Sequence, residues 1–181
     1  KETVLDFKDG WKMVSLKNNV ALSREGKLMN HCVGDELQGY MRGVANGSIQ
    51  ILSLRDPQNM PHATIEVVGR EIKQIKGNSN GPIKQEYWKY IEKFLNSGKY
   101  EEIEDLKNVG LIVISGVIYS IFNIPRSIKS VPELDLSRMG LTRLPKYLPD
   151  VIGDFYCYYN QLTSLEGAPQ SVGGWFFCNN N

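Results

Sequence analysis

The chain has 181 residues, of which 41% are hydrophobic and 23% charged, and its net charge is +1 at neutral pH. This composition is that of a folded globular protein, and the charge gives no overall attraction for nucleic acid or a membrane surface. The three cysteines are too few and too widely spaced for a secreted disulfide framework, which favours a reducing compartment such as the cytoplasm. The longest apolar run, residues 111–122, is too short and interrupted to span a bilayer.

Helical and strand patterns alternate through the first part of the chain. Helices are expected over residues 23–31 and 36–44, with a break at Gly34. Alternation with period two, bounded by turn-forming residues, then predicts three strands, at residues 49–55, 62–68 and 71–76.

Two further helices are expected before residue 109. Pro82 stands where a first helical turn accepts proline, and apolar residues recur at helical spacing from there to Leu95. A shorter helix is expected over residues 101–109. Residues 1–108 therefore predict an α+β domain, a small three-stranded antiparallel sheet covered by helices.

One face of the predicted sheet carries a mixture of polar side chains. Alternation places the following residues on that face: Ser53, Arg55, His62, Thr64, Glu66, Gln74 and Lys76. Exposure to solvent would explain such a face, because antiparallel sheets commonly have one wet side. A binding site is the alternative, since these side chains combine an anion contact, a titratable base, a hydroxyl and a carboxylate.

His31 and Cys32 adjoin at the expected helix break. A reactive thiolate needs a nearby cation or helix N-terminus, and His31 or, better placed over the sheet, His62 could serve as its base. A buried, structural Cys32 is the alternative. If the domain has a functional pocket, we expect this turn to meet four residues of the polar face: Arg55, His62, Thr64 and Glu66. One cysteine and two histidines lack the paired spacing of a zinc site, so neither a metal nor a cofactor is expected.

Four motifs, in this order, resemble the PcfJ-like domain of conjugative-plasmid and bacteriophage proteins. They are Gly26-Lys-Leu-Met-Asn-His-Cys-Val-Gly34, Ile51-x-Ser-Leu-Arg55, Pro61-His-Ala-Thr-Ile-Glu66 and Gln74-x-Lys-Gly-Asn-Ser-Asn80. The resemblance spans residues 10–97 and implies a mobile-element or phage context, in the host cytoplasm or a virion. It assigns no reaction, but it marks these motif positions: His31, Cys32, Gly34, Arg55, Thr64, Glu66, Gln74 and Asn80.

The last part of the chain repeats itself every 21 residues. Leu134, Phe155 and Phe176 open three segments that superpose, and a fainter copy lies at residues 112–122. The period and spelling resemble leucine-rich repeats of bacterial effectors and, more closely, of phage-encoded arrays. Residues 109–181 are therefore expected to form a short leucine-rich-repeat solenoid of three to four turns, and the chain, ending within a repeat, to be a fragment of a longer product.

Side chains in this repeat have expected roles. Asn160 would satisfy buried backbone groups at a turn. Cys157 and Cys178 occupy an inward apolar position, with a zinc site or a disulfide between them as the less favoured alternatives. The outward aromatics are expected to form a partner surface or to contact another part of the protein, and they are Tyr156, Tyr158 and Phe177.

Three functions remain open at this point. The favoured one is a phage or mobile-element binding module, whose solenoid engages a protein and whose first domain holds a small polar ligand through Arg55, Thr64, Glu66, Gln74 and Asn80. A hydrolase or transferase with Cys32 as nucleophile is the alternative, although no Asp or Asn that orients a histidine is evident. A nucleic-acid role has weak support, because the nearby glutamates dilute a small basic patch formed by Arg55, Lys73, Lys76 and Lys84.

Overall fold

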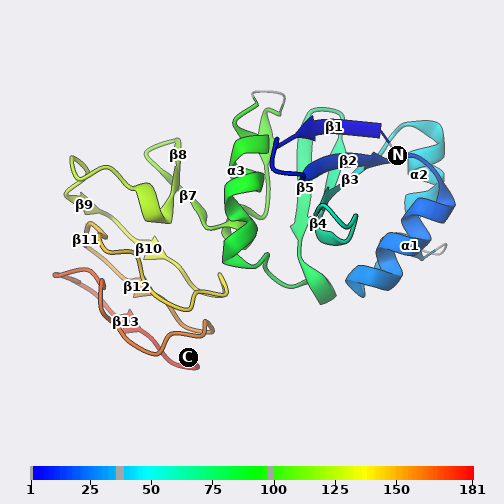
Figure 1. The fold of residues 1–181 in the computed structure, drawn as a ribbon. Coiled ribbons are helices and arrows are strands. Elements are labelled where there is room, and N and C mark those ends of the chain that lie inside the picture. Colours follow the sequence, from blue (N-terminus) through cyan, green and yellow to red (C-terminus); the bar gives the residue numbers. More distant parts are fainter. Residues whose placement is uncertain (1, 36–38, 98–99) are drawn as a thin grey trace. The chain divides into compact units, whose positions relative to one another are not determined.

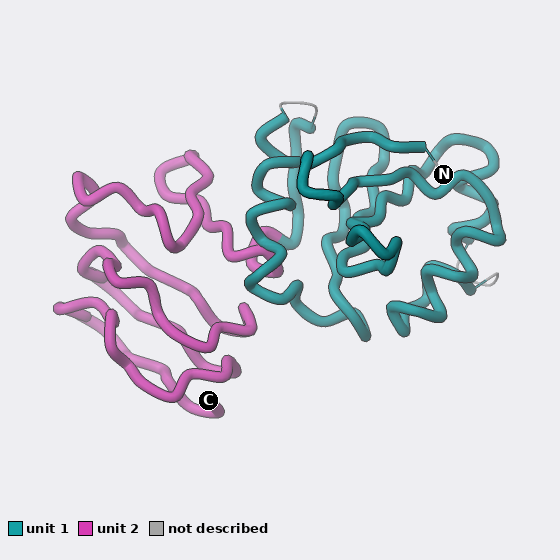
Figure 2. Tube along the Cα trace, viewed as in Figure 1, with its two compact units in different colours: residues 1–105 teal, residues 106–181 magenta. Residues whose placement is uncertain are grey.

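The computed structural model describes residues 2–35, 39–97 and 100–181 (Figure 1). The chain divides into two compact units, Lys1–Asp105 and Leu106–Asn181 (Figure 2). Within the described residues, no helix is both long and apolar enough to cross a membrane.

The first unit is built on a six-stranded sheet with the strands in chain order. The strands are β1 (Glu2–Asp6), β2 (Lys12–Leu16), β3 (Gln50–Arg55), β4 (Pro61–Val68), β5 (Glu71–Lys76) and β6 (Glu102–Ile103). Neighbours from β1 to β5 pair antiparallel, whereas β6 joins β5 in parallel. The sheet is therefore mixed.

The predicted fold of this unit was wrong in two respects, the number of strands in the sheet and the layer of helices expected to cover it. The three predicted strands are present as β3, β4 and β5, but β1, β2 and β6 double their number, and the helices do not cover the sheet as a layer. The helix expected over residues 101–109 is absent. Glu101 and Glu104 instead donate their backbone N–H groups to carbonyls of Arg70 and Ile72 beside β5. A 3₁₀ turn, η5 (Leu106–Val109), follows.

The first motif, residues 26–34, lies on one helix and a short turn, and a second helix follows. Helix α1 (Asn19–Met29) begins at Asn18, whose side chain accepts the N–H of Ala21 at 3.0 Å, and ends at Asn30 in the left-handed region, φ 51°. The 3₁₀ turn η1 (Cys32–Gly34) follows, and then helix α2 (Tyr40–Asn46). Residues 36–38 of the predicted second helix lie outside the described residues.

Two glycines let η1 pack directly on the backbone of α1. A Cβ atom on Gly26 would lie 2.8 Å from the Gly34 nitrogen, and one on Gly34 would lie 2.9 Å from the Leu22 carbonyl oxygen. Real Cβ atoms do not approach other atoms so closely, so larger side chains would separate the turn from the helix. This contact fixes the position of Cys32, which lies within the turn.

The predicted amphipathic helix before residue 98 is confirmed from Trp88 onward, but the helical turn expected at Pro82 is absent, because residues 81–84 lie in no helix. A 3₁₀ turn, η4 (Gln85–Tyr87), leads into α3 (Trp88–Leu95), and the helix buries five side chains: Trp88, Tyr90, Ile91, Phe94 and Leu95. These side chains lie on one face of the helix, and this helical spacing of apolar residues predicted the helix from the sequence.

The second unit consists of short strands in three small sheets. Strands β7 (Leu111–Ile114) and β8 (Val117–Ser120) form an antiparallel hairpin. The parallel pair is β9 (Ser130–Val131) with β11 (Asp150–Val151), and the parallel three-stranded sheet is β10 (Leu134–Asp135), β12 (Phe155–Tyr156) and β13 (Phe176–Phe177).

The prediction of a leucine-rich-repeat solenoid is wrong. The second unit divides into separate small sheets, and the segment 112–122 that was expected to form its first copy belongs to the β7–β8 hairpin. That hairpin turns at Ser115 and Gly116, which both have positive φ, as a tight two-residue turn requires. The 21-residue spacing instead sets the register in which Leu134, Phe155 and Phe176 pair.

The predicted role of Asn160 is confirmed. Its Oδ1 accepts the N–H groups of Met139 and Leu141, both at 3.0 Å. Its Nδ2 donates to the carbonyls of Leu136 and Cys157, both at 2.9 Å. The side chain therefore satisfies four backbone groups at once.

The aromatic and cysteine positions differ between the middle and the edge of the three-stranded sheet. Cys157 is fully buried as expected, and so is its neighbour Phe155. Phe176 is 41% exposed and Cys178 is only half-buried, because β13 is an edge strand of the sheet. Both cysteines are free thiols. Tyr156 stacks on Phe177 with ring centres 5.1 Å apart, and Tyr158 meets the edge of Tyr156.

Candidate functional site

A small pocket lies where the η1 turn faces β4 and β5. Val33 and Ile51 give it an apolar lining, and its polar lining is His31, Cys32, Tyr40, Thr64, Glu66, Gln74, Lys76 and Asn80. Its cavity volume is about 20 Å³, room for about one water molecule. A ligand could therefore insert only a few of its atoms.

The strand register explains why these polar residues meet. Thr64 pairs with Lys76, and Glu66 pairs with Gln74, so the two pairs stand side by side on one face of β4 and β5. Asn80 follows in the 3₁₀ turn η3 (Asn78–Asn80), with φ 59°. Lys76 is held by Asp105 at 2.9 Å, so the end of the first unit fixes one side of the pocket.

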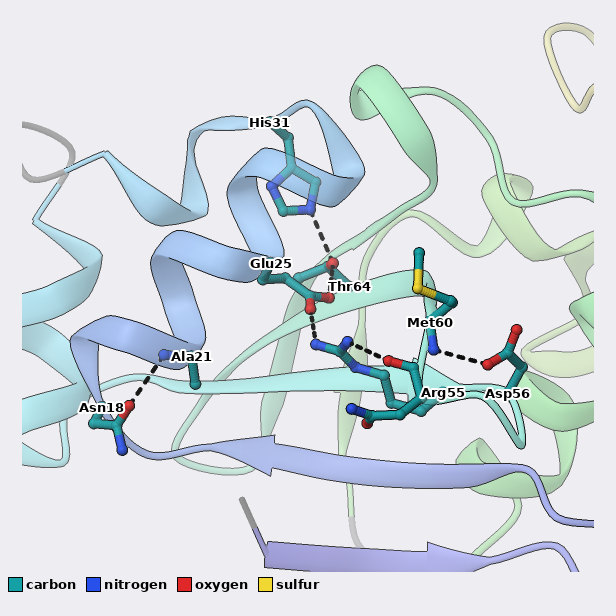
Figure 3. Close-up of polar contacts among 9 residues, drawn as sticks. Asn18, Ala21, Glu25, His31, Arg55, Asp56, Met60 and Thr64 are labelled. Carbon is teal, nitrogen blue, oxygen red and sulfur yellow. Dashed lines mark hydrogen bonds and ion pairs between the residues drawn. The ribbon is translucent and has the colours of Figure 1, made fainter.

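A buried ion pair lies behind the pocket (Figure 3). Glu25 of α1 and Arg55 of β3 are 0% and 2% exposed and bond directly to each other. Arg55 Nη1 also donates to the carbonyl of Asn59 at 3.0 Å. Charges this deeply buried are tolerated only when they are paired and hydrogen-bonded.

A hydrogen-bond chain connects this ion pair to His31 (Figure 3). The ionised Glu25 can only accept, so the Thr64 hydroxyl donates its one proton to Glu25 Oε1 at 2.8 Å. Thr64 Oγ1 must then accept from His31 Nε2, which lies 2.8 Å away. Burial lowers the pKa of His31 and favours the neutral ring. In this chain, neutral His31 therefore carries its proton on Nε2.

Tyr40 adds a hydroxyl donor to the pocket. Its O–H donates to Glu66 Oε2 at 3.3 Å. Burial, together with the neighbouring Glu66 and Cys32, raises the pKa of Tyr40 to about 12. The phenol therefore stays protonated at physiological pH, and the Cys32 thiol beside it is exposed.

Two of the predicted site residues lie elsewhere. Arg55 is behind the pocket and does not line it, because its guanidinium forms a buried ion pair with Glu25 inside the unit. His62 does not face Cys32 as expected, because the register of β3 and β4 shifts between Leu54 and Arg55 and takes His62 out of the alternation. A pocket that uses His62 as the base for Cys32 is therefore not formed.

His62 belongs instead to a separate aromatic cluster. Its Nε2 lies 3.0 Å from Asp56 Oδ2, and its ring lies 4.9 Å from that of Trp11 and 4.5 Å from that of Tyr87. Burial raises the pKa of Asp56, but hydrogen bonds from His62 and the Met60 backbone outweigh burial and leave that pKa lowered. The contacts hold His62 in a structural role.

Sequence reasoning missed Glu25 and Tyr40. Glu25 is buried on the same helical face as Leu22 and Met29, so a carboxylate at a core position was the available signal. Tyr40 had no comparable signal, because its place depends on how α2 follows the η1 turn. No group of three or more His, Cys, Asp or Glu side chains suited to a metal occurs among the described residues.

The pocket lies within a recognisable family region. A family model described as PcfJ-like protein matches residues 2–92. The chain belongs to the PcfJ-like family. The PcfJ-like match includes η1, α2, β3, β4, β5 and η3, which supply the lining of the pocket, and it ends before the second unit. No curated protein and no solved structure matches the chain.

Proposed function

We propose that the first unit is a binding module of a plasmid- or mobile-element-associated family, and that it holds a small polar group of its ligand in the η1 pocket. The observation that carries the proposal is the convergence of polar side chains from five segments on one apolar-lined pocket. The buried Glu25–Arg55 pair supports it, because such a pair, through Thr64, holds His31 in one orientation at the pocket.

The chemistry of the lining favours an amide as the bound group. Glu66 can accept an N–H, while Lys76 and Asn80 can donate to a carbonyl oxygen. The small volume admits only the tip of such a group, and Val33 and Ile51 give the pocket its apolar lining. An anionic ligand would be set against the Glu66 carboxylate, and a cationic one against the Lys76 ammonium, which is already paired with Asp105.

The test uses acetamide as a probe, with acetate and guanidinium as charged controls of similar size. Each is titrated into the full chain while backbone amide shifts are followed by NMR. We expect acetamide to shift the amides of Cys32, Glu66 and Gln74 in the millimolar range, and the charged probes to shift them less. Glu66→Ala should abolish the response, whereas Glu86→Ala, an exposed carboxylate outside the pocket, should keep it. A response that survives Glu66→Ala, or no response to acetamide, contradicts the proposal.

A Cys32-dependent hydrolase or transferase is the second candidate. Cys32 is exposed in the same pocket as the imidazole of His31. Cys32→Ser separates the two functions, because a binding site should tolerate the change and a thiol nucleophile should not. Loss of a covalent adduct with a thioester probe in this variant, with acetamide binding kept, would favour the enzyme.

A further inference from the structure

The second unit contains a basic groove that the proposed function does not use. Two adjoining hollows of about 490 and 580 Å³ share Arg126, Lys146 and Gly167 in their linings. Lys129 lines one hollow and Arg143 the other. Together, four exposed cations flank one continuous groove within this unit.

These cations are available to a ligand. Within the described residues, none of Arg126, Lys129, Arg143 and Lys146 forms an ion pair. Two lysines of the first unit differ: Lys73 pairs with Glu71 and Glu104, and Lys76 with Asp105. Other exposed cations, such as Lys27 and Lys84, also lack an ion pair among the described residues, but these four line one groove.

Aromatic rings hold the two arginines in place. The guanidinium carbon of Arg126 lies 5.2 Å from the centre of the Tyr147 ring, and that of Arg143 lies 5.6 Å from the centre of the Phe122 ring. The Tyr147 hydroxyl is itself anchored to the carbonyl of Ile128 at 2.6 Å. A stacked guanidinium keeps its N–H groups at its edge, so both arginines can bind carboxylates with little loss of side-chain freedom.

We propose that this groove binds an acidic segment of a partner protein. The charges in the groove are discontinuous, because Asp150 and Glu166 stand among the cations. A nucleic acid carries a phosphate at every nucleotide and would set some of them against these carboxylates. A peptide can place its carboxylates opposite the cations and neutral residues opposite Asp150 and Glu166. The Thr142, Thr163 and Ser164 side chains of the second hollow suit hydrogen bonds to such a peptide.

The experiment measures fluorescence anisotropy of a labelled peptide of alternating Glu and Ser residues, titrated with the full chain at low salt. Parallel titrations use a Lys and Ser peptide and a single-stranded DNA of similar length. The test variant is Arg126→Ala with Lys146→Ala. Its control is Lys27→Ala with Lys84→Ala, two exposed lysines of the first unit, which changes the net charge by the same amount. Circular dichroism checks that all variants fold.

We expect the acidic peptide to bind and the groove variant to raise its Kd about tenfold or more, while the control variant changes it less than twofold. Added salt should weaken binding, as for any exposed charge contact. Equal weakening in both variants would mean attraction by net charge alone and would overturn the proposal. So would an absence of binding, or DNA that binds more tightly than the acidic peptide and is lost with the groove variant. Failure here leaves the acetamide response of the first unit unaffected, so the two proposals are tested separately.

Discussion

Glu25 is the residue on which the pocket depends most. It lies at a core position of α1, where an apolar side chain would be expected, and its two oxygens engage Arg55 and Thr64. The arrangement is incompletely satisfied, since Arg55 Nε and the Ser53 hydroxyl have no hydrogen-bond partner among the described residues. A buried polar group without a partner costs stability. The ion pair therefore serves to orient Thr64 and His31, and an apolar pair would pack at least as well.

Replacing Glu25 alone should strongly destabilise the first unit. Glu25→Ala leaves the Arg55 charge buried without its partner, and we expect the free energy of unfolding to fall by about 3–5 kcal/mol. The double variant Glu25→Leu, Arg55→Met should lose much less, because it removes both charges. Urea unfolding measures both, with the exposed Glu86→Ala as the control. A single variant as stable as the double variant would show that the pair is not an energetic unit.

Sequence reasoning succeeded where one residue pattern decided the structure. The convergence of His31, Cys32, Thr64 and Glu66 followed from alternation and from the helix break at Gly34. It failed for His62, because the register shift between β3 and β4 at this position cannot be recognised from the alternation of polar and apolar residues. It failed for Glu25, because a carboxylate on an amphipathic helix reads as solvent-exposed until its partner is known.

At the scale of elements, the spacing of apolar residues predicted segments that form strands and a helix, but it did not predict which strands pair. The strands β3 to β5 and the helix α3 could be read from periods of 2 and 3.6 residues. Strand β6 could not, since two residues carry no period and the strand exists only by pairing with β5. The 21-residue repeat was a real signal of register, yet each paired strand is two residues long and gives separate small sheets.

The contact between α1 and η1 should be sensitive to one methyl group. Gly26→Ala improves helix propensity by about 1 kcal/mol. Its Cβ atom, however, would lie 2.8 Å from the backbone nitrogen of Gly34, which cannot move away as a flexible side chain could. Such overpacking typically costs about 1–3 kcal/mol, so we expect a net loss of stability and a shifted Cys32. Thermal unfolding and the rate of Cys32 alkylation measure the two effects.

The neighbouring Lys27→Ala is the matched control for that change. Lys27 is exposed on the same helix, so its replacement should alter stability by less than about 0.5 kcal/mol and leave Cys32 reactivity unchanged. A Gly26→Ala protein at least as stable as the parent, with unchanged Cys32 reactivity, would mean that the turn does not depend on this close approach.

At the scale of the whole molecule, the sequence pattern placed the end of the first part at residue 108, and the first compact unit ends at Asp105. The family match stops at residue 92, yet the sheet continues to β6 and Asp105. Asp105 accepts the N–H of Ile75 at 3.2 Å and pairs with Lys76, which lines the pocket. Polar residues after position 98 gave no sign of this, because they act through backbone bonds to a strand more than 20 residues away.

The first unit should therefore fold alone as residues 1–105 but lose stability as residues 1–97. The shorter fragment lacks the bonds from Glu101 and Glu104 to Arg70 and Ile72, and those of Asp105 to Ile75 and Lys76. At about 0.5–1.5 kcal/mol for each hydrogen bond, we expect the free energy of unfolding to fall by about 2–5 kcal/mol. Urea unfolding of both fragments measures this difference, and Asp105→Ala within residues 1–105 isolates the share of that side chain. Equal stability of the two fragments would show that β6 is dispensable, and a fragment 1–105 that does not fold would show that the first unit is not independent.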